Sequence, residues 1–358
     1  MKNGESPASV LLVKTRLFVH HPKAGQVSLR GQGDALGDWN RDVAPAWTNT
    51  DVACFELDRP QETSTPLKPV ISAEGLWALG RNDVVPAGSS EFHLYPTFEK
   101  GPGQVKTLFP NFYSHTLHNH RDITVYLPPG YDENPQKRYP VIYMLDGQNV
   151  FEATGSEHGA SWKADQTMDA LIHADKVPPA IVVGIAHQGA QRITEYSPTP
   201  DARFPEAGKA SLFCDFLEQE LKPQVDAALR TEGAAENTFL VGSSMGGLLS
   251  LYCGMTRPHF VKNVASMSPS SWWNNQWLTR ETGEGRLSPA GLKRLWVDHG
   301  DRVLDEGDIT QHLKTALRRH GLSEGDGRFQ TWEQPGAPHS EAEWAKRLPL
   351  VFEWLLRR

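Results

Sequence analysis

Two adjacent serines lie in the segment GSSMG, residues 242–246. The segment fits the pattern G-x-S-x-G, in which the central serine occupies a sharp turn between a strand and a helix. The apolar residues 239–241 precede it, and the mainly apolar residues 248–252 follow it. The spacing therefore predicts Ser244, and not Ser243, as a nucleophile. A glycine-rich turn in which the serines are incidental is the alternative.

The backbone of such a turn explains what the serine needs from its neighbours. The serine takes a strained conformation that projects its side chain above the sheet, and the flanking glycines let the strand and the helix approach without Cβ clashes. The start of the helix also directs a backbone N–H, here that of Met245, toward negative charge that develops during a reaction. These features predict covalent catalysis in which Ser244 attacks a carbonyl carbon.

A serine hydroxyl needs a base, and in hydrolases with this turn the chain order is serine, acid, histidine. His339 lies in the Gly/Pro-rich segment EQPGAPHSE, residues 333–341, between the last expected strand and the last expected helix. A loop bounded by prolines can hold an imidazole above the edge of the sheet. The other late histidines fall in an expected strand or on a helix face: His299, His312 and His320. We therefore predict His339 as the base, with a surface histidine at a helix start as the alternative.

The elements that must position these residues form a repeated pattern. Several nearly continuous apolar runs are typical of strands buried on both faces of a parallel sheet. Strands are expected at 123–127, 140–146, 180–186, 239–242, 261–267, 295–299 and 329–332. Helical spacing of apolar residues is found at 211–229, 308–320 and 341–358. This alternation predicts an α/β fold, with a mostly parallel sheet and helices on both faces.

The region before residue 100 has a different character. Short strand-like stretches at 11–20, 26–31 and 52–58 are separated by Gly, Pro, Asn and Asp. This density of turn residues, without a helical period, predicts a small all-β sandwich. Because the segment EKGPGQVKT, residues 99–107, has the composition of a linker, the expected domains are 1–104 and 105–358.

Five separated segments resemble the esterase D and enterochelin-esterase group of α/β hydrolases, in the order found in that group. They are YLPPGYD (126–132), PVIYMLDGQNVF (140–151), GSSMGG (242–247), MSPSSWW (267–273) and PHSEAEWAKRLP (338–349). The resemblance covers residues 105–358. It implies an α/β-hydrolase fold and a serine carboxylic-ester hydrolase, with Ser244 as nucleophile and His339 as base.

The resemblance also assigns a role to the segment DGQN, residues 146–149. It implies that the backbone N–H of Gly147 or Gln148 joins that of Met245 in an oxyanion hole. Without the resemblance, this segment is simply a good turn.

The acid of the expected triad departs from the family pattern. In similar hydrolases it follows the penultimate strand, three residues after a glycine, and here that position holds Val303. We favour Asp301 as the acid. Asp305 or Glu306 could take its place after a shift in the loop, or a Ser–His dyad could operate without an acid. All these carboxylates could also be solvated charges at a helix start.

Three segments of the first domain resemble starch-binding domains of the immunoglobulin-like type. They are VSLRGQGDALGDWN (27–40), VACFELD (52–58) and LKPVISAEGLWALGRNDVVP (67–86). The resemblance implies that Trp39 and Trp77 stack on sugar rings. Tryptophans in a small sandwich are also common in the core, and the domain could instead shape the mouth of an active site.

The substrate is a small-molecule ester whose identity the sequence leaves open. Arg192, Trp272, Trp273 and Trp162 are candidates for binding it. Cationic and aromatic groups of this kind suit a siderophore lactone with catecholates, and they equally suit an acylated sugar or an aryl ester. The alternative to an esterase is a carbohydrate-binding or scaffolding protein with a degenerate hydrolase domain.

Composition argues against several classes of protein. The 358 residues are 39% hydrophobic and 22% charged, as in ordinary globular chains, and a net charge of -7 argues against nucleic-acid binding. No apolar run has the length of a membrane span or a secretory signal, which favours the cytoplasm. The three cysteines lie far apart, and no metal-binding or phosphate-binding motif is found. We therefore expect no metal and no organic cofactor.

Overall fold

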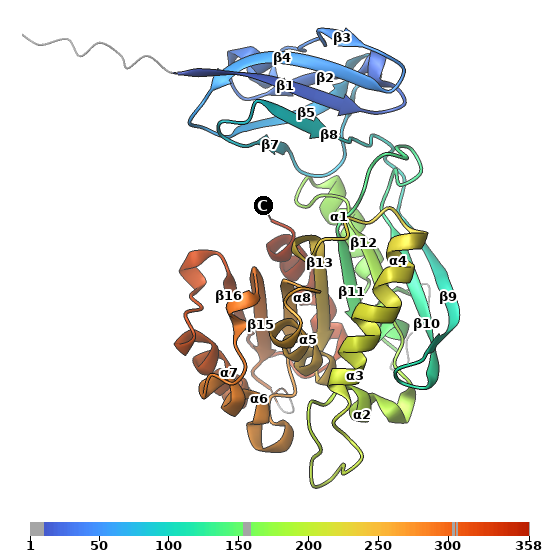
Figure 1. Cartoon of the computed structure of the whole chain (residues 1–358), viewed down its shortest axis with the longest axis vertical. Helices are drawn as coiled ribbons and strands as arrows, with labels where there is room; N and C mark the ends of the chain where they lie inside the picture. The colour runs from blue at the N-terminus through green and yellow to red at the C-terminus, as the bar shows by residue number, and fades with distance from the viewer. Residues whose placement is uncertain (1–10, 153–158, 303–304, 306, 358) are drawn as a thin grey trace, which may run out of the picture. The chain divides into compact units, whose positions relative to one another are not determined.

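The computed structural model describes residues 11–152, 159–302, 305 and 307–357. The chain divides into two compact units. The first contains residues 1–102, 129–137 and 172–178, and the second contains residues 103–128, 138–171 and 179–358. Each unit is described by itself below (Figure 1).

The first unit is built from two small β-sheets. One sheet has the strand order β3-β4-β1-β8, and the other has the order β2-β5-β6, with β7 paired to β5. The strands are β1 (Leu12–His20), β2 (Ser28–Gly31), β3 (Trp47–Thr48), β4 (Val52–Pro60), β5 (Thr65–Ile71), β6 (Leu76–Trp77), β7 (Asp83–Val85) and β8 (Glu91–Leu94). Buried apolar side chains from both sheets form one core, which includes Leu17, Val19, Phe55 and Leu67. The expected β-sandwich is confirmed.

The second unit contains an eight-stranded sheet of order β16-β15-β14-β13-β11-β12-β10-β9. Its strands are β9 (Gln104–Ser114), β10 (Asn119–Leu127), β11 (Val141–Leu145), β12 (Ile181–Ile185), β13 (Thr238–Ser243), β14 (Asn263–Met267), β15 (Arg294–Gly300) and β16 (Phe329–Gln334). The strands from β12 to β16 along this order pair in parallel, whereas β10 pairs antiparallel with both β12 and β9. All seven strands expected in this region are present.

One expectation about this unit is wrong. The segment 99–107 was expected to be a linker, but β9 begins within it, at Gln104. β9 is an edge strand with mostly exposed or half-buried residues, and it contains Pro110. A proline is tolerated at a sheet edge because no ladder hydrogen bond is lost there. Such a strand lacks the apolar run by which the buried strands were identified.

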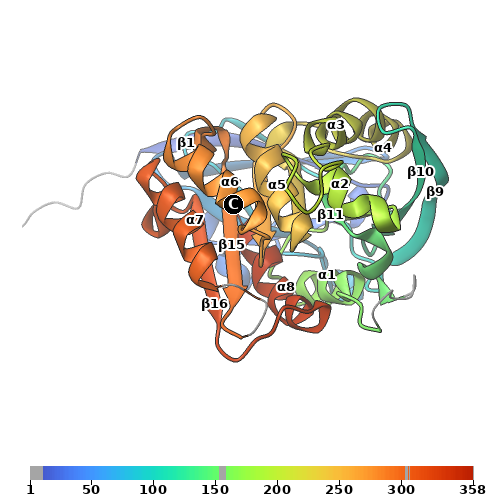
Figure 2. The ribbon, with the colours of Figure 1, turned by 90° about the horizontal axis from the view of Figure 1, so that it is seen from below.

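Helices cover both faces of the large sheet. They are α1 (Ala164–His173), α2 (Arg192–Tyr196), α3 (Ala210–Asp215), α4 (Lys222–Ala228), α5 (Met245–Thr256), α6 (Trp273–Gly283), α7 (Gly307–Arg319) and α8 (Glu341–Leu355). A π-helical turn, Phe216–Leu221, connects α3 to α4. Figure 2 shows α5 on one face of the sheet and α1 and α8 on the other. The expected fold class, a mostly parallel α/β sheet, is confirmed.

The parallel strands determine where a site can form. All residues of β11 and β12–β15 are buried. Because these strands run in the same direction, the loops that follow β11, β13, β15 and β16 emerge at one edge of the sheet. Ser244 and His339, which lie 95 positions apart in the sequence, are therefore brought to a common edge.

Candidate active site

Ser244 occupies the turn between β13 and α5, with φ 57° and ψ −124°. A positive φ costs a residue with a Cβ about 1–3 kcal/mol, and hydrogen bonds hold the backbone in this conformation. The Ser244 N–H donates to the carbonyl of Met267 at 3.0 Å, and the Ser244 carbonyl accepts from the N–H of Leu248 at 3.1 Å. Ser244 is partly exposed, whereas Ser243 is buried. The accessible serine is thus the one that the spacing predicted.

Close packing of β13 against α5 requires glycine at position 242. A Cβ on Gly242 would lie 2.5 Å from the carbonyl oxygen of Gly246, which is far inside van der Waals contact. A larger residue at position 242 would push α5 away from β13 and would displace Ser244. The first glycine of the sequence pattern therefore has a steric function in this turn.

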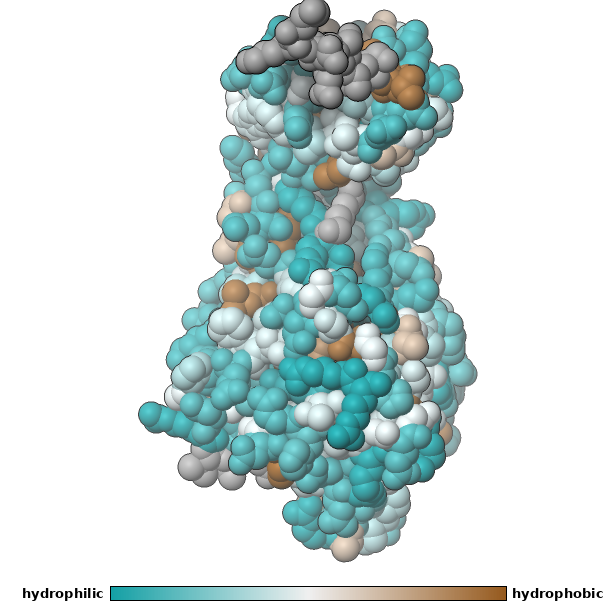
Figure 3. Space-filling model, turned by 90° about the vertical axis from the view of Figure 1, so that its left-hand side faces the viewer, coloured by the Kyte–Doolittle hydropathy of each residue, from teal (hydrophilic) through white to brown (hydrophobic). Residues whose placement is uncertain are grey.

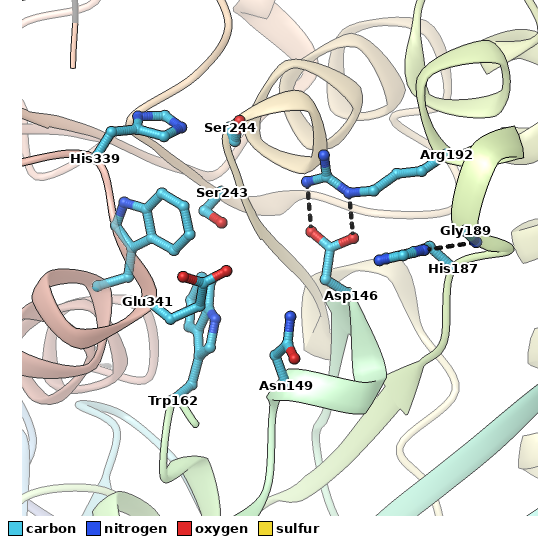
Figure 4. Close-up of a pocket in the computed structure, with 11 residues that line it drawn as sticks. Asp146, Asn149, Trp162, His187, Gly189, Arg192, Ser243, Ser244, His339 and Glu341 are labelled. Atoms are coloured by element: carbon cyan, nitrogen blue, oxygen red, sulfur yellow. Dashed lines mark hydrogen bonds and ion pairs between the residues drawn. The ribbon is translucent and has the colours of Figure 1, made fainter. Parts of the chain in front are cut away.

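His339 lies in the loop between β16 and α8. Its Nδ1 is 2.6 Å from Oδ1 of Asp305. Its ring packs edge-on against Trp344, with the ring centroids 4.9 Å apart at an angle of 88°. His339 and Ser244 line the same cavity, and Figure 4 shows the imidazole directed toward the serine. The two residues chosen from the sequence therefore face each other, and a carboxylate lies behind the imidazole.

The carboxylate that contacts His339 is not the one that we favoured from the sequence. Asp301 is exposed, and its Oδ1 accepts a hydrogen bond from a backbone N–H of the histidine loop at 2.6 Å. Asp305 is buried and holds the imidazole. The prediction that Asp301 orients the histidine is therefore wrong, and the alternative, Asp305, occupies that place. Val303 and Glu306, also considered for this loop, lie outside the described residues.

Hydrogen bonds turn Asp305 inward and keep it charged. Its Oδ2 accepts from the hydroxyl of Ser268 at 3.0 Å and from the backbone N–H of Gly300. Burial by itself raises the pKa of this carboxyl. The hydrogen bonds outweigh burial and hold the pKa below its usual value; their donors are His339, Gly300 and Ser268. Asp305 is therefore an anion at neutral pH.

The ionised carboxylate determines the tautomer of the histidine. A carboxylate only accepts hydrogen bonds, so the proton between Asp305 and His339 belongs to Nδ1 of the ring. In the neutral imidazole, Nε2 then carries no proton and can accept one from the hydroxyl of Ser244. The arrangement matches the division of roles in a Ser-His-Asp triad.

Ser268, which the sequence analysis did not select, links Asp305 to a buried network. Its Oγ accepts hydrogen bonds from Nε1 of Trp344 at 3.0 Å and from Nη2 of Arg347 at 2.7 Å. These two bonds use both lone pairs of the hydroxyl, so its own proton is directed to Asp305. Arg347 also lies 3.3 Å from the buried Asp298. Ser268 lies in the motif MSPSSWW, and Trp344 and Arg347 lie in the motif PHSEAEWAKRLP. The polar residues of these two motifs were therefore the sequence signal from which the network could have been found.

The predicted oxyanion donors lie in the segments that follow two neighbouring strands. Met245 begins α5 directly after Ser244, and Gly147 and Gln148 follow β11, which pairs with β13. Asp146 takes a left-handed conformation, φ 59° and ψ 46°, that reverses the chain after β11. A Cβ on Gly147 would lie 2.5 Å from a backbone nitrogen of β12, so glycine is required for the loop to pack there. The use of these N–H groups in an oxyanion hole stays a prediction.

A cavity of about 410 Å³ opens beside Ser244 (Figure 4). Most of its described lining residues have polar side chains, and two are tryptophans: Asp146, Asn149, Trp162, His187, Gly189, Arg192, Ser243, Ser244, His339, Glu341 and Trp344. Of the residues predicted to bind substrate, Arg192 and Trp162 are part of this lining. The volume is sufficient for an aryl or sugar-sized group.

Two other predicted substrate residues lie elsewhere. Trp273 is buried, and its indole N–H donates to the carbonyl of Thr199 at 2.9 Å. Trp272 packs under the guanidinium of Arg203, 4.8 Å from the ring centroid. Neither belongs to the cavity as the described residues define it. Both indoles are engaged by neighbouring groups of the chain, and substrate binding by Trp272 and Trp273 stays a prediction.

Arg192 has a partner within the protein that the sequence did not reveal. Its Nε and Nη2 donate to the two carboxylate oxygens of Asp146 at 2.7 and 2.8 Å. Burial lowers the pKa of the guanidinium. The charge and the hydrogen bonds of Asp146 raise the pKa by more than burial lowers it, so the net shift is upward. The charges of Arg192 and Asp146 therefore cancel within the cavity, and the pair braces the start of the predicted oxyanion loop.

Trp39 and Trp77, the two tryptophans of the first unit that were predicted to bind sugar, are partly accessible. Trp77, on β6, is half-buried, and the guanidinium of Arg30 lies 5.2 Å from its ring centroid. Trp39 is half-buried in a turn with φ 66°. Sugar binding by these residues stays a prediction.

The described part of the chain contains no group of three or more His, Cys, Asp or Glu side chains that could hold a metal ion. It also contains no helix with the length and apolarity that a membrane crossing requires.

Comparison with known sequences places this site in a family. Residues 114–354 match the family described as "Putative esterase". The ferri-bacillibactin esterase BesA of Bacillus subtilis is 28% identical over 198 residues, which are 51% of this chain and 64% of that protein. An endo-1,4-β-xylanase/feruloyl esterase of Xylanibacter ruminicola is 29% identical over 260 residues, which are 70% of this chain and 32% of that protein. The chain thus spans less than two thirds of the length of these relatives.

Solved structures of esterases share the fold. The enterobactin esterase FES from Shigella flexneri has a TM-score of 0.55 at 16% identity, over 96% of this chain and 93% of that one. The ferulic acid esterase of Anaeromyces mucronatus has a TM-score of 0.54 at 23% identity, over 72% of this chain and 90% of that one. These matches confirm the resemblance to the enterochelin-esterase group. With its serine turn, its histidine loop and a family match over residues 114–354, the chain belongs to the putative esterase family.

Proposed function

We propose that the protein is a serine carboxylic-ester hydrolase that works through an acyl-enzyme. The observation that carries the proposal is that Ser244 and His339 line one cavity, while the buried Asp305 holds Nδ1 of His339 from behind. The strained turn presents the serine, and the buried carboxylate leaves Nε2 of the imidazole free to act as base. The family match and the relatives named as esterases support this reaction class.

The reaction follows from this arrangement. Oγ of Ser244 attacks the ester carbonyl carbon while Nε2 of His339 takes the hydroxyl proton. Asp305 stabilises the resulting imidazolium. The N–H groups of Met245 and of Gly147 or Gln148 donate to the oxyanion. The imidazolium then protonates the leaving alcohol, and His339 activates a water molecule that hydrolyses the acyl-enzyme.

The substrate belongs to one of two ester classes in this proposal. One relative is named a ferri-bacillibactin esterase, and another is named a xylanase/feruloyl esterase. A siderophore-type lactone and an acylated sugar are therefore the candidate substrates. Carbohydrate binding by the first unit would favour the second candidate. The free thiols Cys54, Cys214 and Cys253 suit a reducing compartment, and we keep the cytoplasm as the proposed location.

Hydrolysis of p-nitrophenyl acetate tests the proposed reaction. Ser244→Ala should lower kcat by at least about 10³-fold, because the nucleophile is lost. Ser243→Ala removes the same atom from the neighbouring buried serine and should keep most of the activity. If wild type and Ser244→Ala release product equally slowly, the protein is not an esterase of this kind, and the degenerate-hydrolase alternative gains support.

A further inference from the structure

Glu341 places a carboxylate in the cavity beside the catalytic residues. It is the first residue of α8, half-buried, and part of the cavity lining. Figure 4 shows its carboxylate directed into the cavity, on the side opposite Arg192. A carboxylate at the start of a helix lies near the positive end of the helix dipole.

The carboxylate of Glu341 has open acceptor positions. No described residue donates a hydrogen bond to this carboxylate. Its charge is attracted by the guanidinium of Arg192 across the cavity. Glu343, in the same helical turn, is different. Its carboxylate accepts from Gln334 at 2.7 Å and from Lys346 at 2.6 Å. Glu343 thus has hydrogen-bond donors within the protein, whereas the carboxylate oxygens of Glu341 are available to accept hydrogen bonds from a ligand.

The cavity has a negative balance of charge among its described lining residues. Asp146 and Arg192 form a bidentate pair and cancel each other. Glu341 then contributes the remaining formal charge, and the ionised Asp305 adds to the negative field behind His339. An anionic group entering this cavity would lose hydration and would meet repulsion, whereas a donor group would satisfy the carboxylate.

We infer that Glu341 is a specificity-determining residue that selects esters bearing a hydrogen-bond donor, a hydroxyl or an ammonium group, near the scissile bond. The same residue disfavours esters that bear an anionic group at that position. The inference rests on the proposed esterase function and narrows its substrate class. It favours acylated polyhydroxy or amino compounds, or metal-free phenols, over substrates presented as polyanions.

Three methyl benzoates of nearly equal size test the inference. They carry a para substituent that is cationic (aminomethyl), neutral and donating (hydroxymethyl), or anionic (carboxylate). Wild-type kcat/KM should be at least about tenfold higher for the cationic ester than for the anionic one. Glu341→Gln should reduce this ratio about tenfold and should change the neutral ester less than about threefold. Because the neutral ester can donate a hydrogen bond but carries no charge, it separates the contribution of hydrogen bonding to kcat/KM from that of charge.

Glu343→Gln is the matched control, because it removes the same charge from the same helical turn outside the cavity. It should leave the ratio of cationic to anionic ester within about twofold of wild type, since Glu343 lies outside the described cavity lining and is paired with the exposed Lys346. If both substitutions change the ratio of cationic to anionic ester equally, the selectivity comes from the overall electrostatic field of the protein, and the role assigned to Glu341 is overturned. An anionic ester cleaved as fast as the cationic one would also overturn it.

Ligand binding to the inactive Ser244→Ala variant separates this inference from the proposed function. Benzylamine, benzyl alcohol and benzoate are titrated by NMR into this variant, with and without Glu341→Gln. If no ester is cleaved by wild type but benzylamine binds more tightly than benzoate in a Glu341-dependent manner, the esterase proposal fails and the selectivity stands. If esters are cleaved and neither assay depends on Glu341, the selectivity is wrong and the esterase proposal stands.

Discussion

At the level of single residues, one hydrogen bond determines which nitrogen of His339 is available for chemistry. Asp305 holds Nδ1 at 2.6 Å, and it is itself held by Ser268 and by the backbone of Gly300. An amide in place of this carboxylate could donate to Nδ1 and so favour the wrong tautomer. The base would then have its proton on the nitrogen that faces the serine.

This reasoning predicts a clear difference between two aspartates of the same loop. Asp305→Asn should lower kcat for p-nitrophenyl acetate by at least about 10²-fold, because the tautomer and the imidazolium are no longer stabilised. Asp301→Asn should change kcat by less than about threefold, because Asp301 is exposed and its hydrogen bond among the described residues is to the backbone of the histidine loop. A larger loss of kcat in Asp301→Asn than in Asp305→Asn would identify Asp301 as the acid.

The Ser268 hydroxyl predicts a pH effect. It is one of the donors that lower the pKa of Asp305, so Ser268→Ala should raise that pKa. Asp305 acts as an anion, and its contribution is lost as pH falls through its pKa in the folded protein. The loss of folding stability in acid should therefore begin at higher pH in the variant than in the wild type, as measured by urea denaturation over a series of acidic pH values. A role that does not involve the pKa of Asp305 would lower stability by about 1–3 kcal/mol for the unpaired donors, by the same amount at each pH.

At the level of elements, the strand–turn–helix unit depends on glycine. A Cβ at position 242 would meet the carbonyl oxygen of Gly246 at 2.5 Å. We predict that Gly242→Ala lowers the free energy of unfolding by at least about 2 kcal/mol and reduces activity, as measured by urea denaturation and ester hydrolysis. Gly283→Ala, where the nearest contact would be 4.0 Å, is the control. Comparable losses in both variants would argue against a steric role for Gly242.

The large sheet explains how distant loops build one site. Strands β11, β13, β14, β15 and β16 run in parallel, so the segments after them converge. The nucleophile follows β13, the acid follows β15 and the base follows β16. Ser268, which positions the acid, directly follows β14. The site is therefore a product of strand order, and no single element contains more than a part of it.

At the level of the whole molecule, the chain combines two units with different architecture. The face shown in Figure 3 is mostly hydrophilic, with hydrophobic residues in small scattered groups, as is usual for a protein surface. Trp39 and Trp77 of the first unit keep partly accessible rings. A flat indole can stack on the apolar face of a sugar ring, so the first unit is a candidate carbohydrate module.

Binding of β-cyclodextrin to the full chain tests this role. Trp39→Ala and Trp77→Ala should each weaken binding at least about fivefold, since a stacking aromatic contributes more than 1 kcal/mol. Trp47→Ala is the control, because Trp47 is 47% exposed but lies outside the segments that resemble starch-binding domains. Calorimetry that detects no binding, or binding unchanged by both substitutions, would remove the carbohydrate role.

The local order of residues was sufficient to predict much of this protein. Buried strands appear as continuous apolar runs, and the serine turn appears as small residues between an apolar strand and an apolar helix. These patterns reflect interactions between neighbours in the chain, so they were visible before any tertiary contact was known. The fold class, the seven strands expected after residue 107, and the accessible position of Ser244 followed from them.

Contacts between segments that are distant in sequence determined the features of the site that the sequence did not predict. Asp301 and Asp305 are close in sequence, and the choice between them depends on Ser268 and His339, which lie 37 and 34 positions from Asp305. Arg192 was chosen as a cationic residue that could bind the substrate, but a carboxylate 46 positions away neutralises it. Side-chain partners of this kind are selected by packing in three dimensions, because hydrogen bonds and charge pairs require a distance of a few ångströms whatever the separation along the chain.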